Sequence, residues 1–279
     1  MDITASSQSL FRRHIALPQD HGSWVFLLSP LLIGLFAGGV WNFASFLLVV
    51  ACMSAFLLRQ PVAIATKVYS GRRPKRELLP AQFWIAIYGL VGLLALAGLV
   101  FMGHLYLLVL LAPGLPVFAW HLYLVSRRIE RRQMAVELVG CGVLALAAPA
   151  ALWVSRGQLD PQGWWLWLLV WLQSAASIVY AYLRLEQRVM QSAPAIGERV
   201  RMGRRAISFT TFNLLLVSGL LLAGYIPALL PLPYTLQWLE TVWGTLKPAV
   251  GVKPTHIGIR QLIVSTLFTV LFILAWTVL

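Results

Sequence analysis

The sequence predicts an all-α protein embedded in a membrane. Apolar residues make up 59% of its 279 residues, charged residues only 11%, and the mean hydropathy is +0.79. A soluble domain carries about 25% charged residues. Several windows of about 20 residues carry no charge, which is the length of a helix that crosses a bilayer core of about 30 Å. These runs lack the alternation of barrel strands, so helices are predicted throughout.

Nine apolar segments are predicted to cross the membrane. The first begins near Gly22 and is followed by eight others, so we do not expect it to be a cleaved signal peptide. The segments cover about residues 22–39, 42–58, 82–102, 105–125, 134–154, 164–183, 207–226, 228–246 and 262–279.

The eighth segment is the least regular, because the stretch IPALLPLPY at its start holds three prolines. Proline removes a backbone donor and bends or ends a helix. We expect a crossing that is broken or tilted near Pro231 and Pro233. The alternative is a re-entrant segment, which would move the basic residues of connection 247–261 to the other side of the membrane.

The basic residues are predicted to lie on one side of the bundle. All 22 Lys and Arg residues except Arg156 lie in the N-terminal tail or in the connections 59–81, 126–133, 184–206 and 247–261. Positive residues stay on the cytoplasmic side. The predicted topology therefore has the N-terminus inside and the C-terminus outside. Because the charge of +13 flanks the spans, membrane lipids are the expected partners and nucleic acid is not.

The chain is predicted to form one transmembrane domain over residues 1–279. Within it we expect two four-helix halves, about 22–125 and 134–246, and a last helix at 262–279. The connections after the second and sixth segments are long, about 23 residues each, and occupy equivalent places in the two halves. Binding residues are often found on such connections.

No metal or cofactor site is predicted. The two cysteines, Cys52 and Cys141, lie in apolar segments without ligand spacing and are interpreted as buried thiols. The sequence contains no P-loop, GxGxxG, HExxH or GxSxG motif.

Glu137 is the strongest single candidate for a functional residue. It lies in the fifth segment, about one turn past a basic cluster. A charged side chain costs about 2.5–3.5 kcal/mol at mid-membrane and less near the interface. Glu137 either pairs with Arg131 or Arg132 at the inner edge, or lines a polar cavity as an acid–base group.

Four basic residues near helix ends are candidate ligands for an anionic headgroup. Arg59 and Arg184 each follow an even-numbered segment, and Lys67 and Arg188 lie close behind them. The alternative is that these residues only fix the topology and attract anionic lipids, at about 1 kcal/mol each.

The stretch LPQDHGSW places Asp20 and His21 directly before the first apolar run. Asp20 is a suitable helix cap, and Trp24 would then lie at the depth of the membrane interface. Neighbouring side chains on a helix do not face each other, which disfavours a simple Asp–His pair. The alternative is that His21 lines the mouth of a cavity as an acid–base group.

Three stretches resemble the YwiC-like family of bacterial membrane proteins. They are LPQDHGSW near the N-terminus, ELVGCGVLALAAP in the middle and VKPTHIG before the last segment. The resemblance implies a multi-pass protein of the bacterial inner membrane and brings no defined activity.

The predicted architecture is also similar to the UbiA prenyltransferase superfamily, whose members have nine helices and an N-in/C-out topology. The stretches RRPKRELLPAQFW and IVYAYLRLEQR resemble parts of its third and sixth helices. That family uses two Asp-rich motifs to hold Mg²⁺ on a diphosphate. Residues 52–76 here contain no Asp or Glu, so the resemblance does not extend to Mg²⁺-dependent prenyl transfer.

Three functions remain open from the sequence. The first is a UbiA-like protein that binds a lipid or isoprenoid with an anionic headgroup through Arg59, Lys67, Arg184 and Arg188. The second is a small-solute transporter that uses Glu137 and the eighth segment. The third is a non-enzymatic subunit of a membrane complex.

Overall fold

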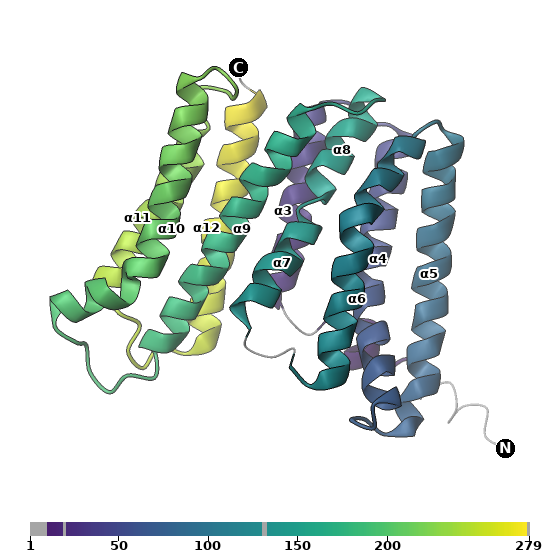
Figure 1. Cartoon of the computed structure of the whole chain (residues 1–279), viewed down its shortest axis with the longest axis horizontal. Coiled ribbons are helices and arrows are strands. Elements are labelled where there is room, and N and C mark those ends of the chain that lie inside the picture. The colour runs from purple at the N-terminus through teal and green to yellow at the C-terminus, as the bar shows by residue number, and fades with distance from the viewer. Residues whose placement is uncertain (1–9, 19–20, 130–132, 278–279) are drawn as a thin grey trace.

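The computed structural model describes residues 10–18, 21–129 and 133–277, which form a bundle of helices without strands (Figure 1). In chain order the helices are α2 (Arg13–Ala16), α3 (His21–Gly38), α4 (Phe43–Tyr69), η1 (Lys75–Glu77), α5 (Leu78–Phe101), η2 (Leu105–Leu110), α6 (Leu111–Arg127), α7 (Met134–Leu144), α8 (Ala147–Arg156), α9 (Gln162–Gln187), α10 (Ile196–Leu222), α11 (Pro231–Leu246) and α12 (Pro254–Thr277).

The predicted all-α membrane bundle is confirmed. Within the described residues, seven helical stretches are long and apolar enough to cross a membrane. The other two predicted segments are the shorter helices α3 and α11, of 18 and 16 residues. At 1.5 Å per residue, α11 is about 24 Å long, less than the bilayer core of about 30 Å. Which end of the bundle faces the cytoplasm stays a prediction.

The prediction of two long connections is wrong, because the helices extend into these stretches. Helix α4 continues to Tyr69, α9 continues to Gln187, and α10 begins at Ile196. The prediction ended each helix at its first charged residue. Long basic side chains can instead remain on a helix and extend to the membrane surface. As a result, Arg59, Lys67 and Arg184 lie on helices.

The expected break in the eighth segment is also wrong. Helix α11 begins at Pro231, with proline in its first turn. Proline suits this place, because the first backbone N–H groups of a helix have no partner within the helix. The interruption lies instead in the fifth segment, between α7 and α8. There Pro149 has no N–H to offer the carbonyl of Ala145, four residues earlier.

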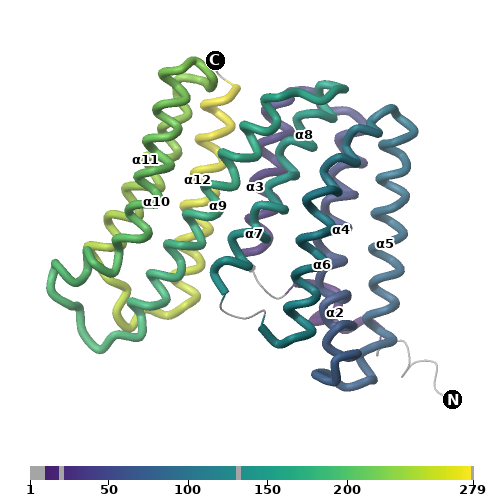
Figure 2. The backbone as a smooth tube through the Cα atoms, in the orientation of Figure 1, coloured from purple at the N-terminus to yellow at the C-terminus, as the bar shows by residue number. Residues whose placement is uncertain are grey.

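Helix α3 lies in the middle of the bundle and packs against both α8 and α12 (Figure 2). Gly34 and Gly38 face α8, where a Cβ on Gly34 would overlap the carbonyl oxygen of Ala148 and stand 2.8 Å from Cβ of Ala151. Small residues spaced by four let two membrane helices approach closely. This contact joins the N-terminal helices to the later part of the chain.

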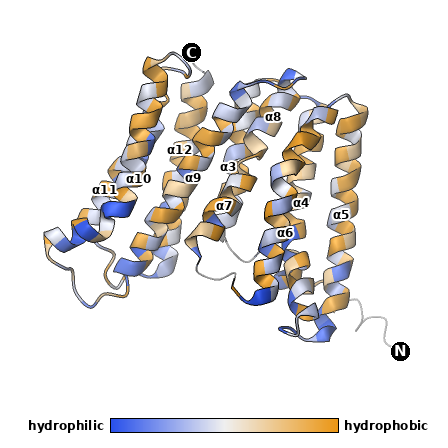
Figure 3. Cartoon of the chain, in the orientation of Figure 1, coloured by the Kyte–Doolittle hydropathy of each residue, from blue (hydrophilic) through white to orange (hydrophobic). Residues whose placement is uncertain are grey.

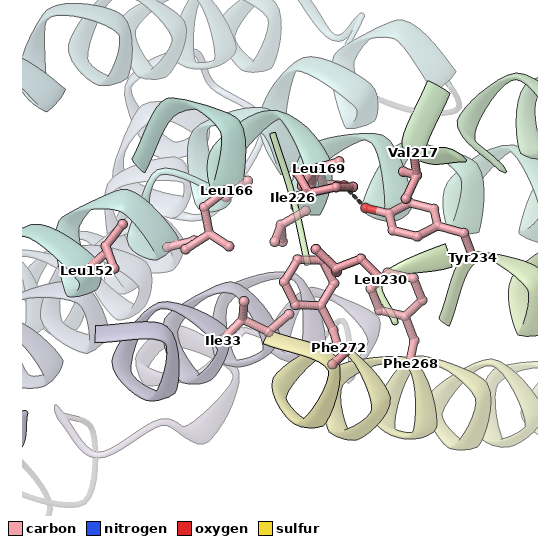
Figure 4. Packing of buried hydrophobic residues seen from close by; sticks show 14 residues of the cluster. Ile33, Leu152, Leu166, Leu169, Val217, Ile226, Leu230, Tyr234, Phe268 and Phe272 are labelled. Carbon is pink, nitrogen blue, oxygen red and sulfur yellow. Dashed lines mark hydrogen bonds between the residues drawn. The ribbon is translucent and has the colours of Figure 1, made fainter. Parts of the chain in front are cut away.

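A buried apolar cluster fills the upper part of the bundle where α3, α9, α11 and α12 meet (Figure 4). Phe268 and Phe272 of α12 pack there beside Tyr234 of α11. The hydroxyl of Tyr234 donates to the carbonyl of Leu169 at 2.9 Å, so its polar atom is satisfied. Hydrophilic residues gather at the lower end, where α4 turns into α5 and α9 into α10 (Figure 3).

We expect Gly34→Ala to destabilise the protein by about 1–3 kcal/mol, because the added methyl overpacks the contact between α3 and α8. The measurement is thermal unfolding in detergent. Gly89→Ala on α5 is the matched control, since a Cβ there meets nothing within 4 Å. Equal melting temperatures for the two variants would contradict the close contact.

Stability at low pH should depend on Asp160, which lies in the turn between α8 and α9 outside the spanning helices. Burial raises the pKa of Asp160, but a hydrogen bond from the Gln162 N–H at 2.7 Å and the ion pair with Arg156 outweigh it and keep the pKa below its usual value. The carboxylate therefore contributes stability above its unfolded pKa of about 3.9, and this contribution disappears as pH falls through the folded pKa.

The variant Asp160→Asn tests this contribution. Melting temperatures measured from about pH 6 down to pH 3 should fall less steeply for the variant than for the wild type. Parallel curves would show that the folded and unfolded pKa values of Asp160 are the same.

Candidate functional site

A carboxylate lies inside the bundle where α9, α11 and α12 meet. The side chain of Glu240 is only 9% exposed. Its Oε1 accepts hydrogen bonds from Arg260 Nε at 2.6 Å and from the Tyr180 hydroxyl at 2.8 Å. Its Oε2 accepts from Arg260 Nη2 at 2.7 Å. The two-pronged contact offsets the cost of a charge inside a membrane.

Arg260 also stacks on an aromatic ring. Its guanidinium carbon lies 3.6 Å from the ring centroid of Trp243 on α11, in cation–π geometry. Two of the five N–H donors of Arg260 bind Glu240, and the side chain is 44% exposed. The other donors are therefore accessible to a ligand.

Arg184 fixes the end of α11 against α9. This arginine is 6% exposed. Its Nη1 donates to the carbonyls of Gly244 at 2.6 Å and Lys247 at 2.7 Å, and to Gln187 Oε1 at 2.9 Å. Carbonyls at a helix C-terminus have no partner within the helix, and a buried guanidinium satisfies them. Arg184 is thus a positioning residue at the back of the site.

Tyr180, Arg184, Trp243 and Arg260 border a cavity of ≈ 490 Å³, which we call the basic pocket. It has two arginines, Arg184 and Arg260, and an exposed histidine, His256, in the first turn of α12. Its remaining lining residues are mainly apolar or aromatic: Tyr180, Trp243, Val252, Ile257, Ile259, Gln261 and Ile263.

A second hollow, of ≈ 690 Å³, runs along the surface between α3 and α12, and we call it the α3–α12 groove. On α3 it extends from Trp24 to Phe36 and on α12 from Leu262 to Leu274, which is about 18 Å in each case. Its walls are apolar apart from a few hydroxyl groups, including Ser29 and Thr269. Ser29 Oγ and Thr269 Oγ1 lie 2.6 Å apart and share a hydrogen bond.

The basic pocket and the α3–α12 groove adjoin along α12. Ile259 and Ile263 line the pocket, while Leu262 and Thr266 line the groove. Residues three and four apart are neighbours on a helix surface. The two hollows therefore lie next to each other along α12, one with a basic lining and the other with an apolar lining.

The fold brings together the segments HGSW and VKPTHIG, which stand more than 200 residues apart in the sequence. HGSW begins α3, and KPTHIG leads into α12, which starts at Pro254. The Ser29–Thr269 hydrogen bond fixes the register between the two helices, which run in the same direction (Figure 1). Eight residues before this pair, His21 and Gln261 stand at a similar depth. Both segments therefore lie at the lower end of the bundle.

The predicted site residues fall into three places. Arg184 lies in the basic pocket, whereas Glu137 and Arg188 line a separate hollow of ≈ 660 Å³ between α7, α9 and α10. Arg59 and Lys67 lie on α4, which shares no packed interface with α9. The four basic candidates are thus not gathered around one ligand.

The remaining candidates lie at the edge of what the structure describes. Helix α3 begins at His21, but the side chain of His21, the whole of Asp20, and Arg131 and Arg132 lie outside the described residues. Their predicted roles as acid–base group, helix cap and ion-pair partners of Glu137 stay predictions. The partner of Glu137 that the structure places is the Tyr182 hydroxyl, which donates to Oε1 at 2.8 Å.

Sequence reasoning missed Glu240, Arg260 and Trp243. A signal was present, because Glu240 is the only charged residue in the predicted eighth segment. The same argument that selected Glu137 applies to it. No group of three or more His, Cys, Asp or Glu residues that could hold a metal ion occurs within the described part of the chain.

Residues 17–152 match the family model described as YwiC-like protein. The similarity to the YwiC-like family thus covers just under half of the chain. The predicted family resemblance is thereby confirmed for the stretches around LPQDHGSW and ELVGCGVLALAAP, whereas VKPTHIG lies outside the YwiC-like region.

A relative from Bacillus subtilis (strain 168), titled "Uncharacterized protein YwiC", is 30% identical over 155 residues. The aligned stretch covers 54% of this chain and 59% of that relative. No solved structure matches the chain. The UbiA-like architecture therefore stays a prediction, while an integral, multi-pass membrane protein with YwiC-like sequence is established.

Replacing the buried carboxylate of Glu240 should destabilise the protein more than replacing an exposed carboxylate. We expect Glu240→Gln to lower the stability by about 1–3 kcal/mol, because Arg260 and Tyr180 lose a charged acceptor. The measurement is thermal unfolding, with Glu198→Gln as the control. Glu198 is exposed and lies 3.5 Å from Arg201, so its loss should have little effect. A smaller effect for Glu240→Gln than for the control would contradict this role.

Proposed function

We propose that this protein binds an amphiphile with an anionic headgroup, a lipid or an isoprenoid, within the bacterial inner membrane. The observation that carries the proposal is the junction of the basic pocket with the α3–α12 groove. The headgroup would contact Arg260 and His256, and the chain would lie along the groove.

The charge of the basic pocket favours an anion. Arg184 and Arg260 contribute two positive charges, and Glu240, behind Arg260, contributes one negative charge. Arg184 already donates hydrogen bonds to backbone carbonyls, so Arg260 is the main donor for a ligand. A basic residue near a membrane surface contributes about 1 kcal/mol to the binding of an anionic headgroup.

The groove would determine which hydrocarbon chain fits, but it would contribute little to the free energy of binding. Leu262, Val270 and Leu274 are about half exposed and would face lipid tails without a ligand. A hydrocarbon chain that moves from the lipid bilayer into the groove gains packing contacts but no hydrophobic free energy. Its length of about 18 Å suits an extended hydrocarbon chain of ordinary lipid size.

The contribution of Arg260 as the headgroup donor can be tested with the double variant Glu240→Gln/Arg260→Gln, which removes the guanidinium without leaving a buried carboxylate alone. We expect the retention of anionic lipid in native mass spectrometry to fall about fivefold, for the loss of about 1 kcal/mol. Arg204→Gln, at an exposed site on α10, is the control and should retain lipid as the wild type does. Unchanged retention in the double variant would overturn the assignment of the headgroup to this pocket.

The groove can be tested separately with Thr266→Trp. Thr266 is exposed and lines the groove, so the indole would fill it without disturbing the core. We expect lipid retention to fall while the melting temperature stays near that of the wild type. A retained lipid in this variant would show that the chain lies elsewhere.

A second candidate function is the passage of protons or a small polar solute, because polar side chains continue from Glu240 into the bundle. A cavity of ≈ 10 Å³, about the space that one water needs, lies at the level of Gln173, Gln237 and Ser265. Above it, the apolar cluster of Figure 4 closes the bundle. The polar column thus reaches from the lower end of the bundle to this cluster, which must open for a proton or solute to pass.

Flux through this column can be measured in vesicles that contain a pH-sensitive dye. Vesicles with the protein should dissipate an imposed pH gradient faster than empty vesicles, and Thr241→Val should slow them, because it removes a hydroxyl that lines the cavity. A rate equal to that of empty vesicles would exclude proton passage under these conditions.

A further inference from the structure

The hollow between α7, α9 and α10, which we call the Glu137 hollow, is separate from the basic pocket. Its volume is ≈ 660 Å³. Met134, Val179, Leu183 and Met202 form an apolar wall and belong to one packed cluster. The hollow lies at the lower end of the bundle, near the start of α7 and the end of α9.

Four charged side chains line this hollow. Two are acidic, Glu137 on α7 and Glu186 on α9, and two are basic, Arg188 after α9 and Arg205 on α10. None of the four forms an ion pair with another residue that the structure describes. Glu137 instead accepts a neutral hydrogen bond from the Tyr182 hydroxyl.

The balance of charge selects the ligand. A purely anionic headgroup would meet two carboxylates, and a purely cationic one would meet two guanidinium groups. A headgroup that carries both an ammonium and a phosphate offers each of the four side chains an opposite charge. Glu137, Glu186 and Arg188 lie at or near helix ends, which is the depth at which headgroups lie.

We propose that the Glu137 hollow binds a zwitterionic phospholipid whose headgroup ends in a primary ammonium. Glu137 and Glu186 accept hydrogen bonds from the ammonium, while Arg188 and Arg205 donate to the phosphate. The acyl chains lie on the apolar wall. A quaternary ammonium has no N–H to donate, so the hollow discriminates against it.

The test is native mass spectrometry of the full chain after exchange into an equimolar mixture of phosphatidylethanolamine, phosphatidylcholine and phosphatidylglycerol. We expect phosphatidylethanolamine to be retained in preference to phosphatidylcholine. Both Glu137→Gln and Arg205→Gln should reduce that retention about fivefold, since each removes one charged contact at an exposed site. The control is Arg204→Gln, because Arg204 is exposed next to Arg205 but does not line the hollow.

Equal retention of phosphatidylethanolamine and phosphatidylcholine by the wild type would overturn the proposal. So would a loss of phosphatidylglycerol instead of phosphatidylethanolamine in Glu137→Gln and Arg205→Gln, because the basic pocket is the proposed site of an anionic lipid. An unchanged preference in both Glu137→Gln and Arg205→Gln would overturn it too. The double variant of the basic pocket, Glu240→Gln/Arg260→Gln, should leave retention of phosphatidylethanolamine unchanged, and a loss there would show that the lipid lies in the basic pocket instead.

Discussion

The ionic contact between Glu240 and Arg260 is the interaction on which the lower half of the C-terminal helices depends. It places a carboxylate among three helices and supplies its counter-charge from the first turns of α12. A carboxylate alone at that position would be costly in a membrane, so α11 and α12 must meet in this register. Tyr180 and Trp243 then complete the contact from α9 and α11.

Helix α3 connects this polar cluster to the rest of the protein. Gly34 and Gly38 let it approach α8 closely, while Ser29 bonds to Thr269 of α12 on another side. The same helix thus contacts the N-terminal and C-terminal parts of the bundle, and it forms one wall of the α3–α12 groove. Of the basic pocket and the α3–α12 groove, this helix is the part that falls in the YwiC-like region.

Both hollows with charged linings lie at the lower end of the bundle, but their charges differ. The basic pocket has a positive excess, whereas the Glu137 hollow is balanced. Helix α9 contributes to both, since Tyr180 and Arg184 line the basic pocket and Tyr182 and Glu186 line the Glu137 hollow. A helix presents successive residues in different directions, so one segment can line two unlike sites.

The sequence by itself determined the all-α membrane class and the approximate places of the apolar helices, because apolar length is a property of the chain alone. It also selected Glu137, since a rare charge in an apolar run is visible without a structure. It could not determine that Glu240 and Arg260 meet, or that HGSW and KPTHIG begin neighbouring helices. These pairs stand 20 and more than 200 residues apart, and no spacing rule links residues on different helices. Only the packing of α3 and α11 against α12 decided which charges share a site.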